Sequence, residues 1–568
     1  MSPEACSLLL LDPSHSFPKP PLPPTSSMAA FEHALILILL LTGLSVIGRW
    51  LPWPLPITYM VGACAAALWT PFPRIELDPG FFFLCFVPPL LFADGWQMPL
   101  RDFIAARRSI LLLATGLVVF TTVSVGLVAH WLVPDLPLAM AFALGAVVSP
   151  TDAVAVGAII HRLKVPARLA AILNGESLMN DATGLVAFKF AIAAVVTGTF
   201  SARAATMDFV VLALGGGITG LSISYVIGRA RDLLRRLHGT DVFTEVTLSL
   251  LTPYASYLVA EGLGLSSILA VVMAGLYAGW RDPVRMDVET RQTALAVWSV
   301  VLFWLNGLAF ILLGLQFPAL LAAITTLYTP AQILIAVGAI SATAIVARLV
   351  WVFPGAYLPF LLSKKLRLSE PRPPWRNVTV VGWAGMRGTI TLAAALSIPR
   401  LLTDGRPFPA RDIVIFLAFG VIAVTLLLQG TTLETLICRL GLRDDNTAAQ
   451  EDRLARIAAI EAGLASLRAA KVARDTDSPE EIAALSLVVA EYEHRLAELT
   501  AKGETRASAH LRRTTARRHR LQALHAERTA LEDLWRRNVI TDAVHHPLQK
   551  LLDHEETMLV AQPTRTET

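Results

Sequence analysis

Long apolar runs, broken by short polar loops, fill the chain from about residue 31 to residue 437. About thirteen of these runs reach the length of roughly 20 residues that a helix needs to cross a membrane. The first 30 residues are instead rich in proline, and from residue 438 onward charged side chains recur at helical spacing. We therefore expect a disordered leader over 1–30, a membrane domain over 31–437 and a cytoplasmic helical domain over 438–568.

The composition supports this division. Of the 568 residues, 54% are hydrophobic and only 16% are charged, whereas soluble domains carry about 25% charged residues. The four cysteines lack metal-ligand spacing, and the charged tail has no glycine-rich loop that could bind phosphate. We expect a protein of the lipid bilayer with no enzymatic activity, no cofactor and no nucleic-acid partner.

Lysine and arginine gather in alternate loops, which orients the chain in its membrane because basic loops stay in the cytoplasm. The basic loops include residues 229–236 and 364–376, and the loops between the basic ones carry few such side chains. This alternation predicts an N-terminus outside the cell and a tail inside it.

The span predicted at 137–160 contains a polar interruption, in which Pro150 directly precedes Thr151 and Asp152. Proline removes a backbone donor and clashes with the preceding helical turn, so the helix is expected to break there. A broken helix at membrane depth is tolerated where it is buried in protein or lines a cavity.

The next predicted span, 167–198, contains the stretch LNGESLMNDATGLVAFK. At 1.5 Å per residue, Asp181 lies about 20 Å into this helix, close to the middle of a hydrocarbon core about 30 Å thick. Glu176 and Asn180 are four residues apart, as are Ser177 and Asp181, so these side chains share one helix face. Oxygen atoms from this face and from the broken helix suit a monovalent cation; inert hydrogen bonds between helices are the alternative.

A third polar stretch, VVGWAGMRGTITLAAALSIP, occupies residues 380–399 and has three glycines around Arg387. A second interrupted span is typical of transporters built from inverted repeats. A buried arginine needs an anion, and Glu176 is the predicted partner of Arg387. The alternative is that Arg387 extends to the membrane surface.

The stretches SPTDAVAV, NGESLMNDATGLV and GWAGMRGTITLAAAL, together with EVTLSLLTPYASYLVAE at 245–261, resemble bacterial sodium/proton antiporters of the first monovalent cation/proton antiporter family, relatives of animal sodium/hydrogen exchangers. The resemblance covers roughly residues 30–437. It implies an all-α polytopic fold of about 13 transmembrane helices with inverted repeats and two crossed discontinuous helices. It also implies a homodimer in the bacterial inner membrane.

By this resemblance, Asp181 binds either Na⁺ or a proton. Ser177 and the backbone of Thr151 are implied as further Na⁺ ligands, and Asp152 is implied to act through water or to orient Asn180. Asn180 directly before Asp181 marks the version of the motif that goes with electroneutral exchange.

The resemblance also implies that Glu176 and Arg387 form a structural ion pair. In one place the sequence departs from the family pattern: many relatives have an acid four residues after the Pro-Pro pair of the third span, where this chain has Ala93 and, one step later, Asp94. Asp94 is therefore a possible accessory residue of the ion site. Lys189 has no assigned role beyond extending toward the outer surface.

These observations predict a secondary transporter that exchanges Na⁺ or Li⁺ for H⁺, because one carboxylate cannot hold both at once. A K⁺/H⁺ antiporter would share every motif above. A cation channel and a non-transporting sensor are less favoured, since the motifs describe one site at mid-membrane. The tail is expected to serve in regulation or subunit contact.

Overall fold

The computed structural model divides into two compact units, Met1–Asp444 and Asp445–Thr568. The described residues are 25–51, 53–69, 79–163, 165–198, 202–369, 372–402, 406–442, 447–473, 479–500 and 504–560. Helix α1 already begins at Thr25, inside the predicted leader, and the rest of that leader lies outside the described residues.

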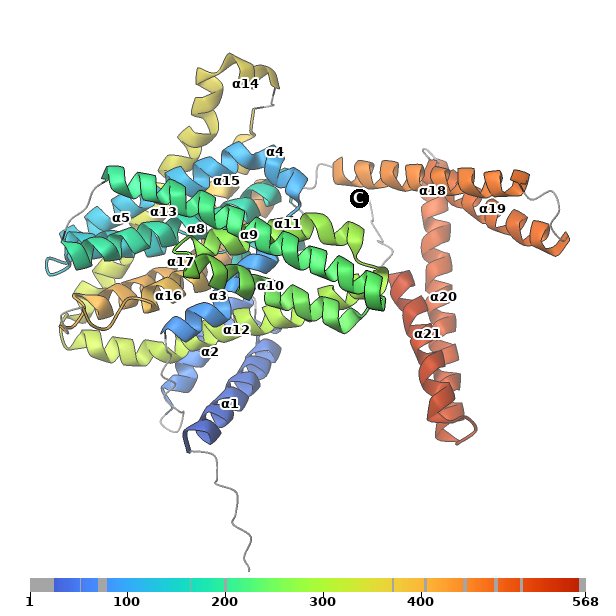
Figure 1. The fold of residues 1–568 in the computed structure, drawn as a ribbon, viewed down its shortest axis with the longest axis horizontal. Coiled ribbons are helices and arrows are strands. Elements are labelled where there is room, and N and C mark those ends of the chain that lie inside the picture. The colour runs from blue at the N-terminus through green and yellow to red at the C-terminus, as the bar shows by residue number, and fades with distance from the viewer. Residues whose placement is uncertain are drawn as a thin grey trace, which may run out of the picture. The chain divides into compact units, whose positions relative to one another are not determined.

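The first unit is a bundle of helices, and no strand longer than an isolated bridge occurs in its described residues (Figure 1). Its helices, in chain order, are α1 (Thr25–Gly48), α2 (Leu55–Ala67), α3 (Pro79–Gln97), α4 (Leu100–Leu111), the π-helical turn η1 (Leu112–Leu117), α5 (Val118–Leu132), α6 (Leu138–Val148), α7 (Ala153–Leu163), α8 (Ala167–Thr197), α9 (Ala202–His238), α10 (Val242–Gly262), α11 (Ser267–Arg285), α12 (Val288–Thr325), α13 (Pro330–Leu362), α14 (Lys364–Ser369), α15 (Trp375–Trp383), α16 (Thr389–Leu396) and α17 (Arg411–Arg439).

Seven helical segments among the described residues are long and apolar enough to cross a membrane by themselves, α8 and α17 among them. Shorter apolar helices such as α2, α3 and α6 accompany them. The all-helical architecture of a polytopic membrane protein is thus present. The count of thirteen spans, the inverted repeat and the crossing of two helices stay predictions.

Two helices are interrupted in the stretches where the sequence predicts it. The first interruption separates Val148, the last residue of α6, from Ala153 at the start of α7, and the second separates α15 from α16 at residues 384–388. The backbone N–H of Asp152 donates to the carbonyl of Met386 at 2.8 Å. The two interruptions therefore contact each other, and each supplies a partner for backbone groups that the other leaves outside a helix.

Helix α8 packs directly against the first interruption. A Cβ atom at Gly184 of α8 would overlap the ring of Pro150, so the missing side chain is what lets the helix come this close. The polar face of α8 is thereby held against the open backbone at Thr151 and Asp152.

The second unit is also helical. Its helices are α18 (Thr447–Ala473), α19 (Pro479–Thr500), α20 (Glu504–Arg536) and α21 (Asp542–Val560). Helix α18 packs on α19, with an ion pair of 2.7 Å between Arg468 and Glu493, and α20 packs on α21, with one of 2.6 Å between Arg528 and Asp553. The sequence places the start of this domain at residue 438, whereas the compact unit starts at Asp445.

Candidate functional site

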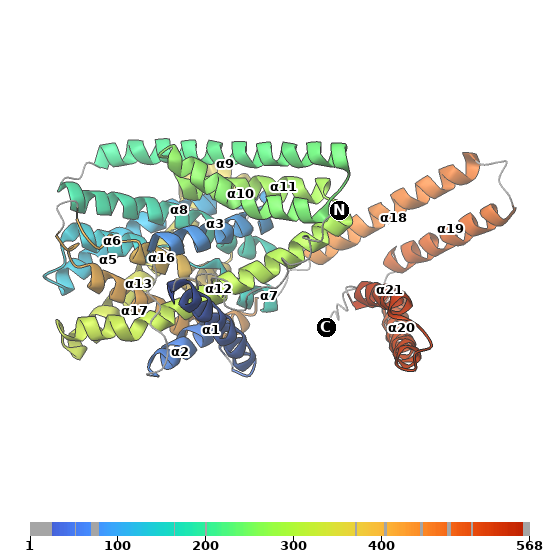
Figure 2. The same cartoon turned by 60° about the horizontal axis from the view of Figure 1, so that its bottom comes forward.

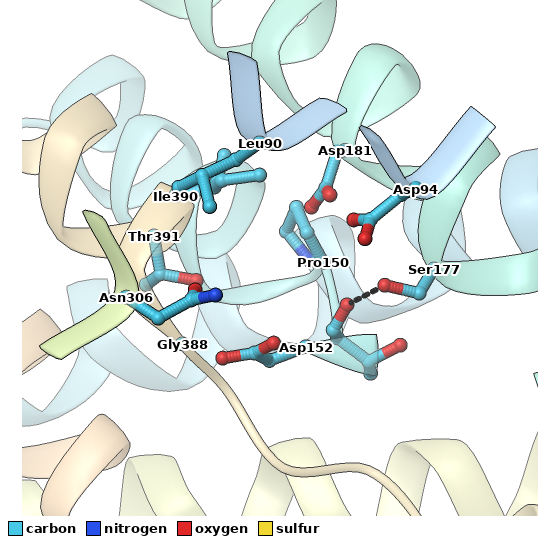
Figure 3. Close-up of a pocket in the computed structure, with 11 residues that line it drawn as sticks. Leu90, Asp94, Pro150, Asp152, Ser177, Asp181, Asn306, Gly388, Ile390 and Thr391 are labelled. Carbon is cyan, nitrogen blue, oxygen red and sulfur yellow. Dashed lines mark hydrogen bonds between the residues drawn. The ribbon is translucent and has the colours of Figure 1, made fainter. Parts of the chain in front are cut away.

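A small polar cavity lies where the two interruptions meet α3, α8 and α12. It has a volume of about 20 Å³, enough for one water-sized particle. Its lining, drawn in Figure 3, consists of Leu90, Asp94, Pro150, Thr151, Asp152, Ser177, Asp181, Asn306, Gly388, Ile390 and Thr391. Four of the five predicted ion-binding residues are therefore brought together in one place.

The broken helix is fixed at Thr151 by two side chains of α8. The hydroxyl of Ser177 donates to the carbonyl oxygen of Thr151 at 2.6 Å, and the amide of Asn180 donates to the hydroxyl of Thr151 at 2.9 Å. All three residues are buried. Ser177 and Thr151 line the cavity, whereas Asn180 does not. Asn180, predicted as an ion-binding residue, thus lies behind Thr151 and positions it.

Three carboxylates surround the cavity, from three separate elements. Asp181 of α8 is buried, and Asp94 and Asp152 are partly buried. In Figure 3 the carboxylates of Asp94 and Asp181 point toward each other, while Asp152 lies nearer to Gly388. Three ionised carboxylates in so small a space repel one another and lose hydration, so the site favours the uptake of positive charge.

The structure assigns a clear place to Asp94, which the sequence left as a possible accessory. Ala93, at the position where many relatives carry an acid, is fully buried away from the cavity. Asp94 lines the cavity opposite Asp181. The one-residue shift in sequence therefore still delivers a carboxylate to the site.

Two further polar residues of the cavity were missed by sequence reasoning. Asn306 of α12 and Thr391 of α16 lie next to each other in Figure 3, across the cavity from Ser177. A signal for Asn306 does exist, because it is a single amide within the apolar stretch VLFWLNGLAFILL. Thr391 follows Arg387 closely and was treated only as part of the glycine-containing motif.

The predicted ion pair between Glu176 and Arg387 is wrong, because Glu176 pairs with Arg348 of α13. Arg348 donates through both terminal nitrogens to the two oxygens of Glu176, at 2.5 and 2.8 Å, and its Nε donates to the carbonyl of Val381 at 3.0 Å. Both charged side chains are about 1% exposed. Bidentate geometry of this kind is what arginine offers a buried carboxylate.

Arg387 is fully buried, but it holds backbone rather than Glu176. Its Nε donates to the carbonyl of Val148 at 2.8 Å, and a terminal nitrogen donates to the carbonyl of Gly385. Val148 is the last residue of α6, where the free carbonyls of a helix C-terminus attract a cation. Arg387 therefore ties the second interruption to the end of the helix that enters the first one, and a position at the membrane surface is excluded.

Comparison with known proteins agrees with the family resemblance seen in the sequence. The family model described as "Sodium/hydrogen exchanger, transmembrane" matches residues 36–438. A protein of Escherichia coli strain K12, named as the uncharacterized Na(+)/H(+) exchanger YjcE, is 36% identical over 94% of this chain and 100% of its own length. The sodium, potassium, lithium and rubidium/H(+) antiporter of Bacillus subtilis strain 168 is 35% identical over 94% of this chain and 79% of its own. The solved structure of the sodium proton antiporter MjNhaP1 from Methanocaldococcus jannaschii has a TM-score of 0.57 at 18% identity, over 73% of this chain and 99% of that one, which is a likeness of fold.

Proposed function

The chain belongs to the sodium/hydrogen exchanger family, and on that premise we propose that it exchanges Na⁺ for H⁺ at Asp181 across the bacterial cytoplasmic membrane. The protein is then a secondary transporter that works without an enzymatic step and needs no cofactor beyond the ions it carries. Sodium expulsion and control of internal pH are the physiological consequences.

The observation that carries this proposal is the cavity itself. It has room for one water-sized particle and is lined by carboxylate, hydroxyl and amide side chains, the oxygen donors that replace the hydration shell of an alkali cation. Asp181 and Ser177 from α8 and the backbone of Thr151 are the proposed Na⁺ ligands. The carboxylates of Asp152 and Asp94 add negative charge around the proposed Na⁺ position.

Coupling follows from the smallness of the site. A proton on Asp181 removes one of the charges that hold Na⁺ and one of its proposed ligands, and a bound Na⁺ blocks protonation, so one occupant leaves before the other enters. Asn180 is uncharged, consistent with one proton for each Na⁺ and hence with electroneutral exchange. A net charge moved in each cycle would instead couple transport to the membrane potential, at about 2.3 kcal/mol per 100 mV.

A second candidate function differs from the first only in the cation that is exchanged for H⁺. The Bacillus subtilis relative is named for sodium, potassium, lithium and rubidium, and oxygen ligands by themselves do not separate these ions. K⁺/H⁺ exchange is therefore the alternative, and it is decided by competition among Na⁺, Li⁺ and K⁺ in vesicles.

The membrane arrangement is proposed from loop charge, with the N-terminus outside and the second unit in the cytoplasm. A homodimer is proposed from the family resemblance. Under this orientation α8 runs from the cytoplasmic side, near Ala167, to the outer side, near Thr197.

The first prediction concerns Asp181. The variant Asp181→Asn keeps the size of the side chain but cannot hold a proton and a cation in turn, so Na⁺-driven H⁺ flux in proteoliposomes should be abolished. Asp135→Asn is the matched control, because Asp135 is exposed and does not line the cavity. In gel filtration, both variants must elute at the same volume as the folded wild-type protein. Exchange retained by Asp181→Asn would remove this residue from the mechanism.

The same vesicles separate an antiporter from the less favoured classes. An antiporter gives saturable cation flux that requires a counter-flow of protons. A channel would give flux without it, and a sensor would bind Na⁺ with no flux at all.

A further inference from the structure

A second cavity lies farther along α8 than the proposed ion site, toward the C-terminal end of that helix. It has a volume of about 240 Å³ and lies between α3, α8, α11 and the segment that follows α16. Its lining consists of Phe83, Leu185, Phe188, Lys189, Ile192, Ile268, Ser397 and Pro399. The floor is apolar, formed by the buried side chains Leu185, Phe188 and Ile268.

Only one lining residue is charged. Lys189 is exposed at the rim, and so is Pro399, which is followed by exposed Arg400. Lys189 lies eight residues beyond Asp181, which is about 12 Å along the helix from the middle of the membrane. Half of the hydrocarbon core is about 15 Å thick, so the long side chain of Lys189 extends to the lipid headgroups while the cavity floor stays at acyl-chain depth.

We propose that this cavity binds one acyl chain of an anionic phospholipid, whose phosphate is held by Lys189. The floor and the rim of the cavity together indicate the occupant. An apolar floor binds neither an ion nor ordered water, and a basic rim attracts negative charge. A free phosphate would satisfy the rim and leave the floor empty. In the proposed orientation the lipid comes from the outer leaflet.

The lipid would lie against the same helices that form the ion site. Leu185 is one turn beyond Asp181 on α8, and Phe83 and Asp94 share α3. Helices α3, α8 and α16 contact one another, and they lie close together in Figure 2. An acyl chain between them would limit how far α8 can move relative to its neighbours, so exchange should depend on the lipid.

Binding is tested on the purified full-length chain by native mass spectrometry, with phosphatidylglycerol as the probe. The wild type should retain phosphatidylglycerol more strongly than phosphatidylcholine of equal chain length. Lys189→Gln should weaken phosphatidylglycerol binding about fivefold, the effect of one basic residue near a lipid surface. Arg406→Gln, which changes an exposed basic residue outside the cavity lining, should leave it unchanged.

Three results would overturn the proposal: equal retention of the two lipids by the wild type, undiminished phosphatidylglycerol binding by Lys189→Gln, or displacement of the lipid by inorganic phosphate. A second variant, Ser397→Phe, fills the cavity and should remove the bound lipid while Lys189 is intact. If a folded Ser397→Phe protein retains the lipid, the acyl chain binds somewhere other than this cavity. All these readouts measure binding, so they stand whether or not Asp181 proves to be the exchange site.

Discussion

Glu176 and Arg348 are opposite charges buried together inside the bundle. Neither lines the ion cavity, yet Glu176 precedes Ser177, which does. Because a buried ion pair loses its hydration, it adds little net stability, but removal of one partner leaves a charge without compensation. The pair therefore links α8 to α13 at a place outside the cavity lining.

Arg348→Met should destabilise the protein by about 3–5 kcal/mol, because Glu176 is then buried without its partner. The double variant Glu176→Gln with Arg348→Met should recover part of this loss. Unfolding in mixed micelles measures the coupling between the two positions as a double-mutant cycle. The cycle between Glu176 and Arg387 is the control, and a larger coupling there would contradict the pairing described above.

Asn306 and Thr391 complete the cavity from the side opposite Ser177, and their oxygens are suited to hold the cation there. Asn306→Ala should raise the KM for Na⁺ about tenfold, the effect of one lost polar contact to a charge. Ser299→Ala is the control on the same helix, since Ser299 is exposed and its hydroxyl donates to the carbonyl of Leu295 one turn earlier. An unchanged KM in Asn306→Ala would restrict the ligands to α8 and the first interruption.

Residue chemistry explains what the sequence could and could not reveal about the site. Asp181, Ser177 and Thr151 stand out because oxygen groups are costly in apolar helices unless they have a use. The partner of Glu176 could not be read in the same way, since Arg348 and Arg387 both lie in apolar spans. Only the fold, which brings Arg348 of α13 to Glu176 of α8, decides between them.

At the level of elements, the two interruptions depend on close contact without side chains. A Cβ at Gly388 would overlap the carboxylate and Cβ of Asp152, whereas a Cβ at Gly157 in α7 would meet no atom within 4 Å. Gly388 lines the cavity and Gly157 lies inside α7, outside the lining, so the two form a natural pair for testing how tightly the interruptions must fit.

Gly388→Ala should therefore displace Asp152 and reduce exchange strongly, while Gly157→Ala should leave it intact and slightly favour the helix. Exchange rates and thermal unfolding of the two variants in parallel check this. If Gly388→Ala exchanges ions normally, Asp152 is not held in place by the second interruption.

Helix ends show where hydropathy stops being informative. The apolar run in the sequence covers residues 110–132, but the helix is continuous from Leu100 through α4, η1 and α5 to Leu132. Arg107 and Arg108 give the first turns of this helix the charge that is typical of a loop. Hydropathy marks the part of a helix that lipid covers, whereas backbone hydrogen bonds carry the helix into the aqueous phase.

At the scale of the whole molecule, the polar cavity belongs to one unit. Every residue that lines the cavity falls between Leu90 and Thr391, inside the unit that ends at Asp444. The second unit has its own packed helix pairs, which are joined by ion pairs such as that of Arg528 with Asp553. Domains with separate cores fold and act separately as a default.

A chain that ends at Asp444 should therefore insert, fold and exchange ions with a KM for Na⁺ within about twofold of the full-length value. Proteoliposomes that contain equal amounts of the two proteins measure this over a range of pH. A chain that ends at residue 429 is the contrast, because it loses the last part of α17, where Thr432 accepts a hydrogen bond from Trp383 of α15, and it should fail to fold. If the chain ending at Asp444 folds but does not exchange, the helices from Thr447 onward are part of the transport machinery. If it exchanges with a shifted pH range, they tune a site that they do not form.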